Sequence, residues 1–137
     1  MNAGSGNIRL SGANGKIHAN VGSGNIKATD LTLAGKGSFN SGSGDVSITL
    51  QSALQYDVSI NSGSGDAKLN YNGNKMEGTV VMTANKNNGE ILAPFKFDKT
   101  EELDEGRNAR IRKTARLSDK DIEIRVSTGS GKAVIEK

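Results

Sequence analysis

The stretch Gly4-Ser5-Gly6-Asn7-Ile8 decides the fold, because four variants of it follow along the chain. The variants are Gly22-Ser23-Gly24-Asn25-Ile26, Gly42-Ser43-Gly44-Asp45-Val46, Gly63-Ser64-Gly65-Asp66-Ala67 and Gly129-Ser130-Gly131-Lys132-Ala133. Between the second glycines the intervals are 18, 20, 21 and 66 residues, and 66 equals three steps of 22. A period of about twenty residues is typical of stacked coils or blades, so the chain is predicted to consist of equivalent units.

Each Gly-Ser-Gly phrase, called a GSG corner below, predicts a tight turn. Glycine lacks a Cβ atom, so it adopts positive φ freely and lets neighbouring backbones approach closely. After each corner apolar and polar residues alternate, as in Val46, Ile48 and Leu50, which indicates a half-buried strand. A weaker second corner lies between the strong ones, for example at Asn14-Gly15. Each repeat is therefore expected to contain two short strands and two turns.

Two arrangements fit this unit. A meander of hairpins would make neighbouring strands antiparallel, whereas a coil that advances one rung per repeat would stack similar corners in parallel. We favour the coil, because each rung then buries the apolar face that its neighbour cannot bury alone. The predicted fold is all-β, a right-handed parallel β-solenoid forming a single domain over residues 1–137. It would have regular repeats over 4–71, looser strands and a charged hairpin over 72–126, and a closing strand over 127–137.

The composition narrows the function classes. Hydrophobic residues make up 34% of the 137 residues and aromatic residues 4%, which suits a narrow solenoid better than a wide enzyme interior. The absence of cysteine excludes disulfides and thiol chemistry. The net charge of +3 does not by itself indicate a nucleic-acid partner. No apolar run approaches the roughly 20 residues of a membrane-spanning helix, so direct membrane insertion of this segment is not expected.

The first corner follows Met1-Asn2-Ala3 with no capping element before it. This suggests that upstream coils, a signal or an anchor belong to a longer precursor. An open solenoid end also offers unpaired backbone to another chain, so a homo-oligomer formed through that end is a further expectation.

One segment differs from the repeats, because residues 98–105 are rich in acidic side chains and residues 107–116 are rich in basic ones. A hairpin turning near Glu105-Gly106-Arg107-Asn108 would pair the two runs across strands. A helix would place Gly106 in its interior, which costs about 1 kcal/mol against alanine, so we favour the hairpin. A strand over 108–116 would align Arg110, Arg112 and Arg116 on one face as a candidate ligand face for carboxylate, sulfate or phosphate. The alternative role of these arginines is pairing with the acidic strand.

Other constellations point to structure rather than chemistry. In a calcium-binding β-roll, carboxylates of successive turns meet at the ion, but only Asp45 and Asp66 provide them here, so both are interpreted as turn formers that bond their own backbone. Gly129-Ser130-Gly131-Lys132 lacks the remaining positions of a phosphate-binding loop. The single histidine, His18, alternates outward and is expected on the surface. We therefore predict no catalytic residue, no metal and no cofactor.

The ordering of these features resembles a known family. Repeated GSG corners followed by Asn or Asp and then Ile or Val, less regular strands, a charged loop and the ending IRVSTGSGKAVIEK are similar to the bacterial putative-adhesin family of unknown function. The resemblance implies a β-solenoid-like structure, a cell-envelope location and no established catalytic residues. Asn7, Asn25 and Lys132 depart from the family pattern, in which Asp is commoner.

The sequence thus predicts a non-catalytic structural or binding module, located at the bacterial cell envelope or outside the cell. It would present a polar β-surface to a glycan or a cell-surface protein. A nucleic-acid partner is not expected, because no aromatic residues accompany the arginine stripe. Two alternatives remain open: a carbohydrate-active enzyme that uses Asp45 and Asp66, and a self-associating scaffold segment of a longer protein.

Overall fold

The computed structural model describes residues 2–12, 14–33, 35–51, 56–71, 78–85, 90–93, 97–102, 110–119 and 121–136. These residues form strands joined by turns and contain no helix. The strands are β1 (Asn2–Ser5), β2 (Ile8–Ser11), β3 (Asn14–Gly15), β4 (His18–Ser23), β5 (Ile26–Leu33), β6 (Gly37–Ser41), β7 (Val46–Leu50), β8 (Val58–Ser62), β9 (Ala67–Asn70), β10 (Thr79–Asn85), β11 (Glu90–Leu92), β12 (Lys99–Glu102), β13 (Arg110–Arg116), β14 (Glu123–Thr128) and β15 (Lys132–Glu136).

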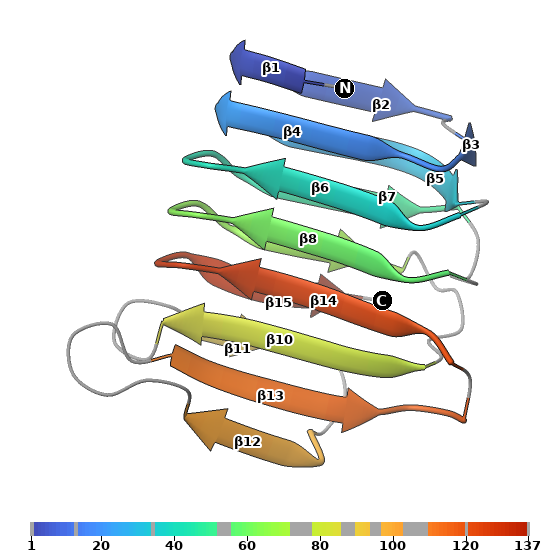
Figure 1. Ribbon diagram of the computed structural model, residues 1–137, viewed down its shortest axis with the longest axis vertical. Helices are drawn as coiled ribbons and strands as arrows, with labels where there is room; N and C mark the ends of the chain where they lie inside the picture. Colours follow the sequence, from blue (N-terminus) through green and yellow to red (C-terminus); the bar gives the residue numbers. More distant parts are fainter. Residues whose placement is uncertain are drawn as a thin grey trace.

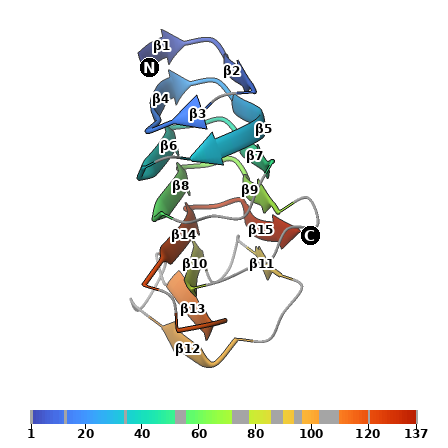
Figure 2. The same ribbon diagram turned by 90° about the vertical axis from the view of Figure 1, so that its right-hand side faces the viewer.

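The strands form two sheets that face each other (Figures 1 and 2). The eight-stranded sheet has the order β1-β4-β6-β8-β14-β10-β13-β12, and the seven-stranded sheet has the order β11-β15-β9-β7-β5-β2, with β3 paired to β5. Every pair is parallel except β10–β13 and β12–β13. The predicted parallel β-solenoid is therefore confirmed and the meander is excluded. The handedness of the coil stays a prediction.

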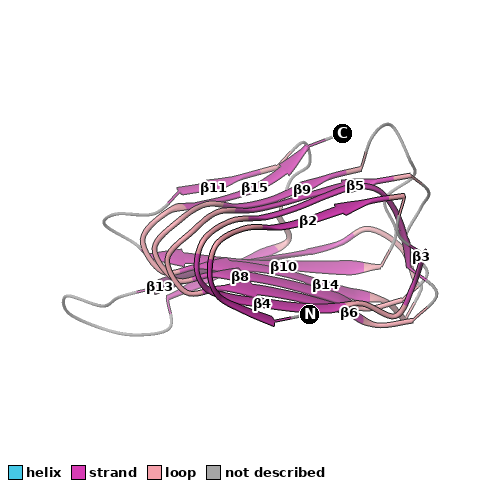
Figure 3. Ribbon diagram, turned by 90° about the horizontal axis from the view of Figure 1, so that it is seen from above, coloured by secondary structure: helices cyan, strands magenta, loops and turns pink. Residues whose placement is uncertain are grey.

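In each repeat that carries a GSG corner, the coil contributes one strand to each sheet and the corner joins the two strands. The view along the stack shows these corners lying over one another at one end of the coils (Figure 3). The registers place Ile26 beside Val46 and Val46 beside Ala67, so equivalent residues of successive repeats are neighbours. The expected unit of two strands and two turns is thus observed.

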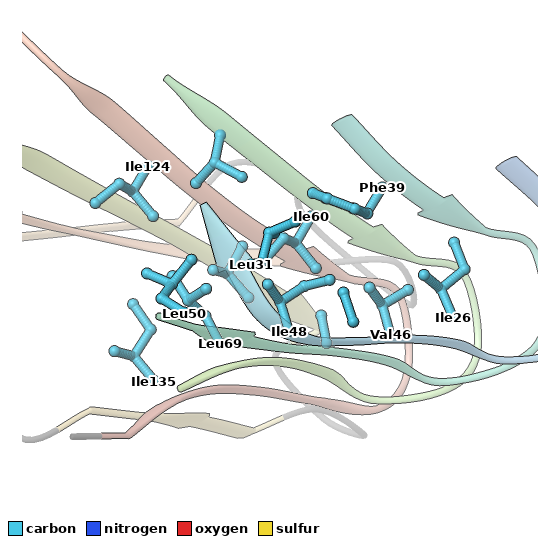
Figure 4. Close-up of a cluster of buried hydrophobic side chains, with 14 of the residues drawn as sticks. Ile26, Leu31, Phe39, Val46, Ile48, Leu50, Ile60, Leu69, Ile124 and Ile135 are labelled. Carbon is cyan, nitrogen blue, oxygen red and sulfur yellow. The ribbon is translucent and has the colours of Figure 1, made fainter. Parts of the chain in front are cut away.

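The core lies between the two sheets. Val46, Ile48 and Leu50 of β7 point inward and are fully buried, and Phe39 and Ile60 of the opposite sheet meet them (Figure 4). Burying one such side chain stabilises the fold by about 1.5–3 kcal/mol. The period-two alternation therefore corresponds to a narrow aliphatic core shared by consecutive rungs.

Close backbone approach, rather than positive φ, explains the glycines of the stacked corners. A Cβ atom on Gly44 would lie 1.8 Å from the carbonyl oxygen of Gly24, and one on Gly131 would lie 2.1 Å from that of Gly65. These four glycines do not have positive φ. Any larger residue would push the rungs apart, so the second glycine of the corner is a packing requirement.

A hydroxyl side chain before the corner ties it to the preceding corner. The Ser62 hydroxyl donates to the Gly44 carbonyl oxygen over 2.7 Å and accepts from the Gly65 N–H over 3.0 Å. Ser41 and Thr128 make the same pair of bonds in their own rungs. All three side chains are buried, so these bonds satisfy polar groups of the corners that water does not reach.

The residue after each corner forms a ladder along the stack. The N–H of Asn25 donates to Asn7 Oδ1 over 3.0 Å, and the N–H of Asp45 donates to Asn25 Oδ1 over 2.8 Å. The N–H groups of Asp66 and Lys132 continue the series, each bonding to the Oδ1 atom of the rung before over 2.8 Å. The prediction that these side chains accept hydrogen bonds from their own backbone is therefore wrong. Each accepts one from the backbone of the next rung, because the closely stacked rungs bring that N–H within reach.

The position of the fifth corner corrects the expected spacing. The interval of 66 residues does not correspond to three steps along the stack, because β15 pairs directly with β9 and β14 pairs directly with β8. After β9 the chain skips one coil position in the stack and forms β10 to β13. It then returns, so that β14 lies between β8 and β10 and β15 lies between β9 and β11. Figure 2 accordingly shows the C-terminus in the middle of the stack and the N-terminus at its end. The physical reason for this placement is close packing of glycines. Gly129 and Gly131 lack side chains, so they can lie against the carbonyl oxygens of Gly63 and Gly65.

The charged segment forms the predicted hairpin. β12 and β13 pair antiparallel, with Glu101 beside Arg112, and they complete the far edge of the eight-stranded sheet. The expected turn near Glu105-Gly106-Arg107-Asn108 lies outside the described residues.

Candidate ligand-binding face

The three predicted arginines lie on β13, whose alternation directs their side chains away from the core. Arg110 and Arg116 are exposed and Arg112 is half-buried, whereas Ala115, on the opposite face of the strand, is buried. The face they share is the outer face of the eight-stranded sheet.

Two of the three arginines line a groove of about 530 Å³, called the arginine groove below. Arg110 and Arg112 form one side of it, with Lys99 and Glu101 of β12 beside them and polar residues of β8, β10 and β14 opposite. Arg116 does not line this groove. The Arg116 guanidinium lies 3.5 Å from Asp119 Oδ1, and the backbone N–H of Arg116 donates to Asp98 Oδ2.

Glu101 organises the charges of the arginine groove. Arg112 Nη2 lies 2.8 Å from Glu101 Oε2, and Lys99 Nζ lies 3.0 Å from Glu101 Oε1. The hydrogen bonds from Lys99 and Arg112 hold the pKa of Glu101 below its ordinary value. The pairing expected between the acidic and basic runs is thus observed for Arg112. Arg110, by contrast, makes no ion pair with another described residue, so its guanidinium is available to a ligand.

A second groove, called the lysine groove below, adjoins the first on the same sheet face. It has a volume of about 430 Å³ and is lined by Lys16, His18, Lys36, Asp57 and residues of β6, β8 and β14. Ser59, Glu123 and Arg125 line both grooves, so the two are continuous. Sequence reasoning missed this groove, because its residues come from distant coils. A signal was present in part, since Lys16 and Lys36 each stand just after the glycine of a weaker corner.

A ladder of asparagine side chains runs along the same face. Asn40 Nδ2 donates to Asn20 Oδ1 over 2.9 Å, and Asn61 Nδ2 donates to Asn40 Oδ1 over 2.7 Å. The same amides also donate to serine hydroxyls two residues earlier, at Ser38 and Ser59, over 3.1 Å in each case. The ladder therefore fixes the serine side chains that line the grooves.

Asp45 and Asp66 lie on consecutive corners, at one end of the coils, and not in either groove. Asp45 Oδ1 accepts the N–H of Asp66, and Asp66 Oδ1 accepts the N–H of Lys132. Among the described residues no group of three His, Cys, Asp or Glu side chains is arranged to hold a metal ion. His18 is exposed, as expected, and lies in the lysine groove.

No helix in the described part of the chain is long and apolar enough to cross a membrane.

In a comparison against protein families, the family model Toastrack DUF4097 matches residues 1–93. The chain belongs to the Toastrack family. A crystal structure of a "putative cell adhesion protein" from Clostridium sporogenes is similar in fold, with a TM-score of 0.53 and 21% sequence identity. The likeness covers 90% of this chain and 55% of that protein, so this chain spans about half of its neighbour's length. A search of curated proteins finds no match.

The Toastrack assignment and the name of the structural neighbour support the resemblance to an uncharacterised putative-adhesin family. At this level of identity, the neighbour shows a shared fold.

Proposed function

We propose that this Toastrack protein is a non-catalytic, adhesin-like binding module that acts at the bacterial cell envelope or outside the cell. The observation that carries the proposal is the arginine groove, in which the ion pair of Arg112 and Glu101 lies beside Arg110, a residue that makes no ion pair with any described residue. The antiparallel pair of β12 and β13, at the edge of the eight-stranded sheet, holds these groups at defined spacing. The partner is a glycan or a cell-surface protein.

The state of the carboxylates supports binding over hydrolysis. Glycosidases use two carboxyl groups about 5–10 Å apart, one of which has a raised pKa so that it can donate a proton. In the arginine groove the pKa of Glu101 is lowered, not raised. Asp45 and Asp66 accept backbone hydrogen bonds that hold the coils together, so their side chains serve the fold.

The name of the structural neighbour supports a surface location, since that protein is described as a cell adhesion protein. A solenoid also suits display, because successive coils extend a surface without enlarging the core.

A glycan array combined with a cell-wall pull-down tests the proposal. The wild-type protein is compared with the double variant Arg110→Ala/Arg112→Ala and with Arg116→Ala, whose side chain lies outside the groove. We expect the double variant to lose binding while Arg116→Ala retains it, with circular dichroism confirming that both variants fold.

If the double variant still binds, the arginine groove is not the binding site. Release of shortened sugar products from a bound glycan would instead favour the enzyme alternative.

A further inference from the structure

The arginine and lysine grooves form one path along the stack. They share three residues and lie over seven neighbouring strands, in the order β4-β6-β8-β14-β10-β13-β12. Neighbouring strands lie about 4.8 Å apart, so the six steps of this path span roughly 29 Å. A path of that length suits an extended polymer rather than a single sugar ring.

Among the charged side chains that line this path, hydrogen-bond donors outnumber acceptors. The Ser38 and Ser59 hydroxyl oxygens accept from asparagine amides, and neither hydroxyl proton is donated to another described residue. These protons are therefore left for a ligand. Lysine and arginine side chains are donors only, so the basic side chains of the path require acceptor atoms on its partner.

The charge balance of the path is also one-sided. The linings of the two grooves together hold six basic residues and three acidic residues, namely Lys16, Lys36, Lys99, Arg110, Arg112 and Arg125 against Asp57, Glu101 and Glu123.

Two of the three acidic residues are paired with basic side chains, and the third accepts a backbone hydrogen bond. Glu101 is held by Lys99 and Arg112, and Glu123 pairs with Arg125. Asp57 accepts the N–H of Glu123 over 2.8 Å.

The basic side chains that make no ion pair with a described residue lie at the two ends of the path. Lys16 and Lys36 at one end, and Arg110 at the other, make no ion pair with a described residue. No phenylalanine, tyrosine or tryptophan is among the described residues that line the two grooves, so these linings lack the aromatic platforms that single-stranded nucleic acids use. An acidic polysaccharide is an extended polymer with regularly spaced acceptors and negative charge, and it needs no aromatic platform.

We propose that an extended anionic polysaccharide binds lengthwise along the stack, across the outer face of the eight-stranded sheet. Lys16 and Lys36 contact one end of the bound segment and Arg110 contacts the other, while Ser38 and Ser59 donate hydrogen bonds between them. This inference rests on the proposed function and specifies its ligand.

Titration calorimetry with polygalacturonate, a linear polyuronate, tests the inference. Its fully methyl-esterified form is the matched probe, because esterification removes the charge and keeps the sugar chain. We expect the acid form to bind, the ester not to bind, and affinity to fall as salt is added. Oligogalacturonides should bind more tightly as they lengthen until they span the path. Equal binding of acid and ester, or no dependence on length, would overturn the inference.

A pair of double variants locates the site. Lys16→Ala/Lys36→Ala removes two charges from the path, and Arg9→Ala/Lys27→Ala removes two exposed charges from the outer face of the seven-stranded sheet. We expect the first variant to bind polygalacturonate on the order of 3- to 10-fold more weakly, and the second to match the wild type. An equal loss of affinity in the two variants would indicate non-specific charge attraction and would contradict the proposed binding site.

Two further probes separate the sources of negative charge and the classes of partner. Dextran sulfate and polyphosphate replace the carboxylate by sulfate and phosphate, and binding of either in the same variant-sensitive way supports the anionic path. Preference for single-stranded DNA over all three polymers would contradict the inference. If an array finds a neutral glycan or a protein instead, the proposed function stands and this inference fails. If no partner is found in either experiment, both fail.

Discussion

The GSG-cornered coils and the far end of the stack are held together by different means. In the coils, glycine carbonyls, buried hydroxyls and the Asn/Asp ladder connect each corner to the next over short distances. At the far end, β12 and β13 are joined as an antiparallel hairpin with an ion pair between Glu101 and Arg112. The comparison shows that register is set by backbone contacts in the coils, whereas charge pairing accompanies the strands at the edge.

The C-terminal coil joins these two regions. Its strands pair with β8 and β9 on one side and with β10 and β11 on the other. Its buried residues include Ile124, Val126 and Ile135. Cooperative folding of the whole stack therefore depends on the last residues of the chain.

Deleting residues 121–137 should have the largest effect. It would leave a gap about 9.6 Å wide, two strand spacings, between coils that must otherwise be 4.8 Å apart. We expect loss of the cooperative thermal transition, measured by calorimetry.

Deletion of residues 1–15 is the matched control, because it removes an end coil whose strands pair on one side only. This variant should still unfold cooperatively at a lower temperature. Similar behaviour of the two deletions would contradict the bridging role of the C-terminal coil.

Gly44→Ala should have the next largest effect. The added Cβ would meet the Gly24 carbonyl oxygen at 1.8 Å, and a clash with backbone is not relieved by turning a side chain. We expect a loss of about 3 kcal/mol or more in the free energy of unfolding, measured in urea.

Gly4→Ala provides the comparison, since nothing lies within 4 Å of a Cβ at that position and its φ is not positive. Its free energy of unfolding should change by less than about 0.5 kcal/mol, as for ordinary surface substitutions. Equal losses in both variants would show that close approach is not the reason for the glycines.

Asp45→Ala should have a moderate effect, because it removes the acceptor of the Asp66 N–H. We expect the free energy of unfolding to fall by about 1 kcal/mol, with Asp45→Asn close to the wild type because the amide keeps an Oδ1 acceptor. Chemical denaturation of the three proteins measures the difference. A large loss in Asp45→Asn would mean that the negative charge, and not the acceptor, matters at this position.

The coiled part of the fold could be predicted from the sequence because its determinants are local and repeated. Two glycines followed by an alternating apolar run specify a corner and then a strand wherever they occur. The pattern correctly predicts the corners that precede β7 and β9 and the strands themselves. The ladder also explains why Asn7 and Asn25 stand where Asp is commoner, since both residue types supply an Oδ1 acceptor. The partner of that acceptor could not be predicted, because it depends on how closely the rungs stack.

The order of the coils and the lysine groove could not be predicted in the same way. Nothing local in the 66-residue interval reveals that the chain skips a place and returns to it. Lys132 offered a hint. Its backbone N–H donates to Asp66 Oδ1, but a lysine side chain has no acceptor for the N–H of a further rung. The lysine groove joins Lys16 to Arg125, residues that become neighbours only through the stacking of several coils.

Glu101→Gln tests the edge of the stack and should have the smallest effect. Lys99 and Arg112 hold the pKa of Glu101 below its ordinary value, so its ion pairs stabilise the folded protein above the ordinary glutamate pKa of about 4.3. That contribution is lost as the pH falls through the lowered pKa of the folded state. Because the side chain is partly exposed, salt should weaken the contribution further. Urea unfolding at neutral and acidic pH should show a slightly smaller loss on acidification in Glu101→Gln than in the wild type. An identical pH dependence in the two proteins would mean that backbone pairing within the hairpin and with β10, and not the ion pairs of Glu101, holds the hairpin in place.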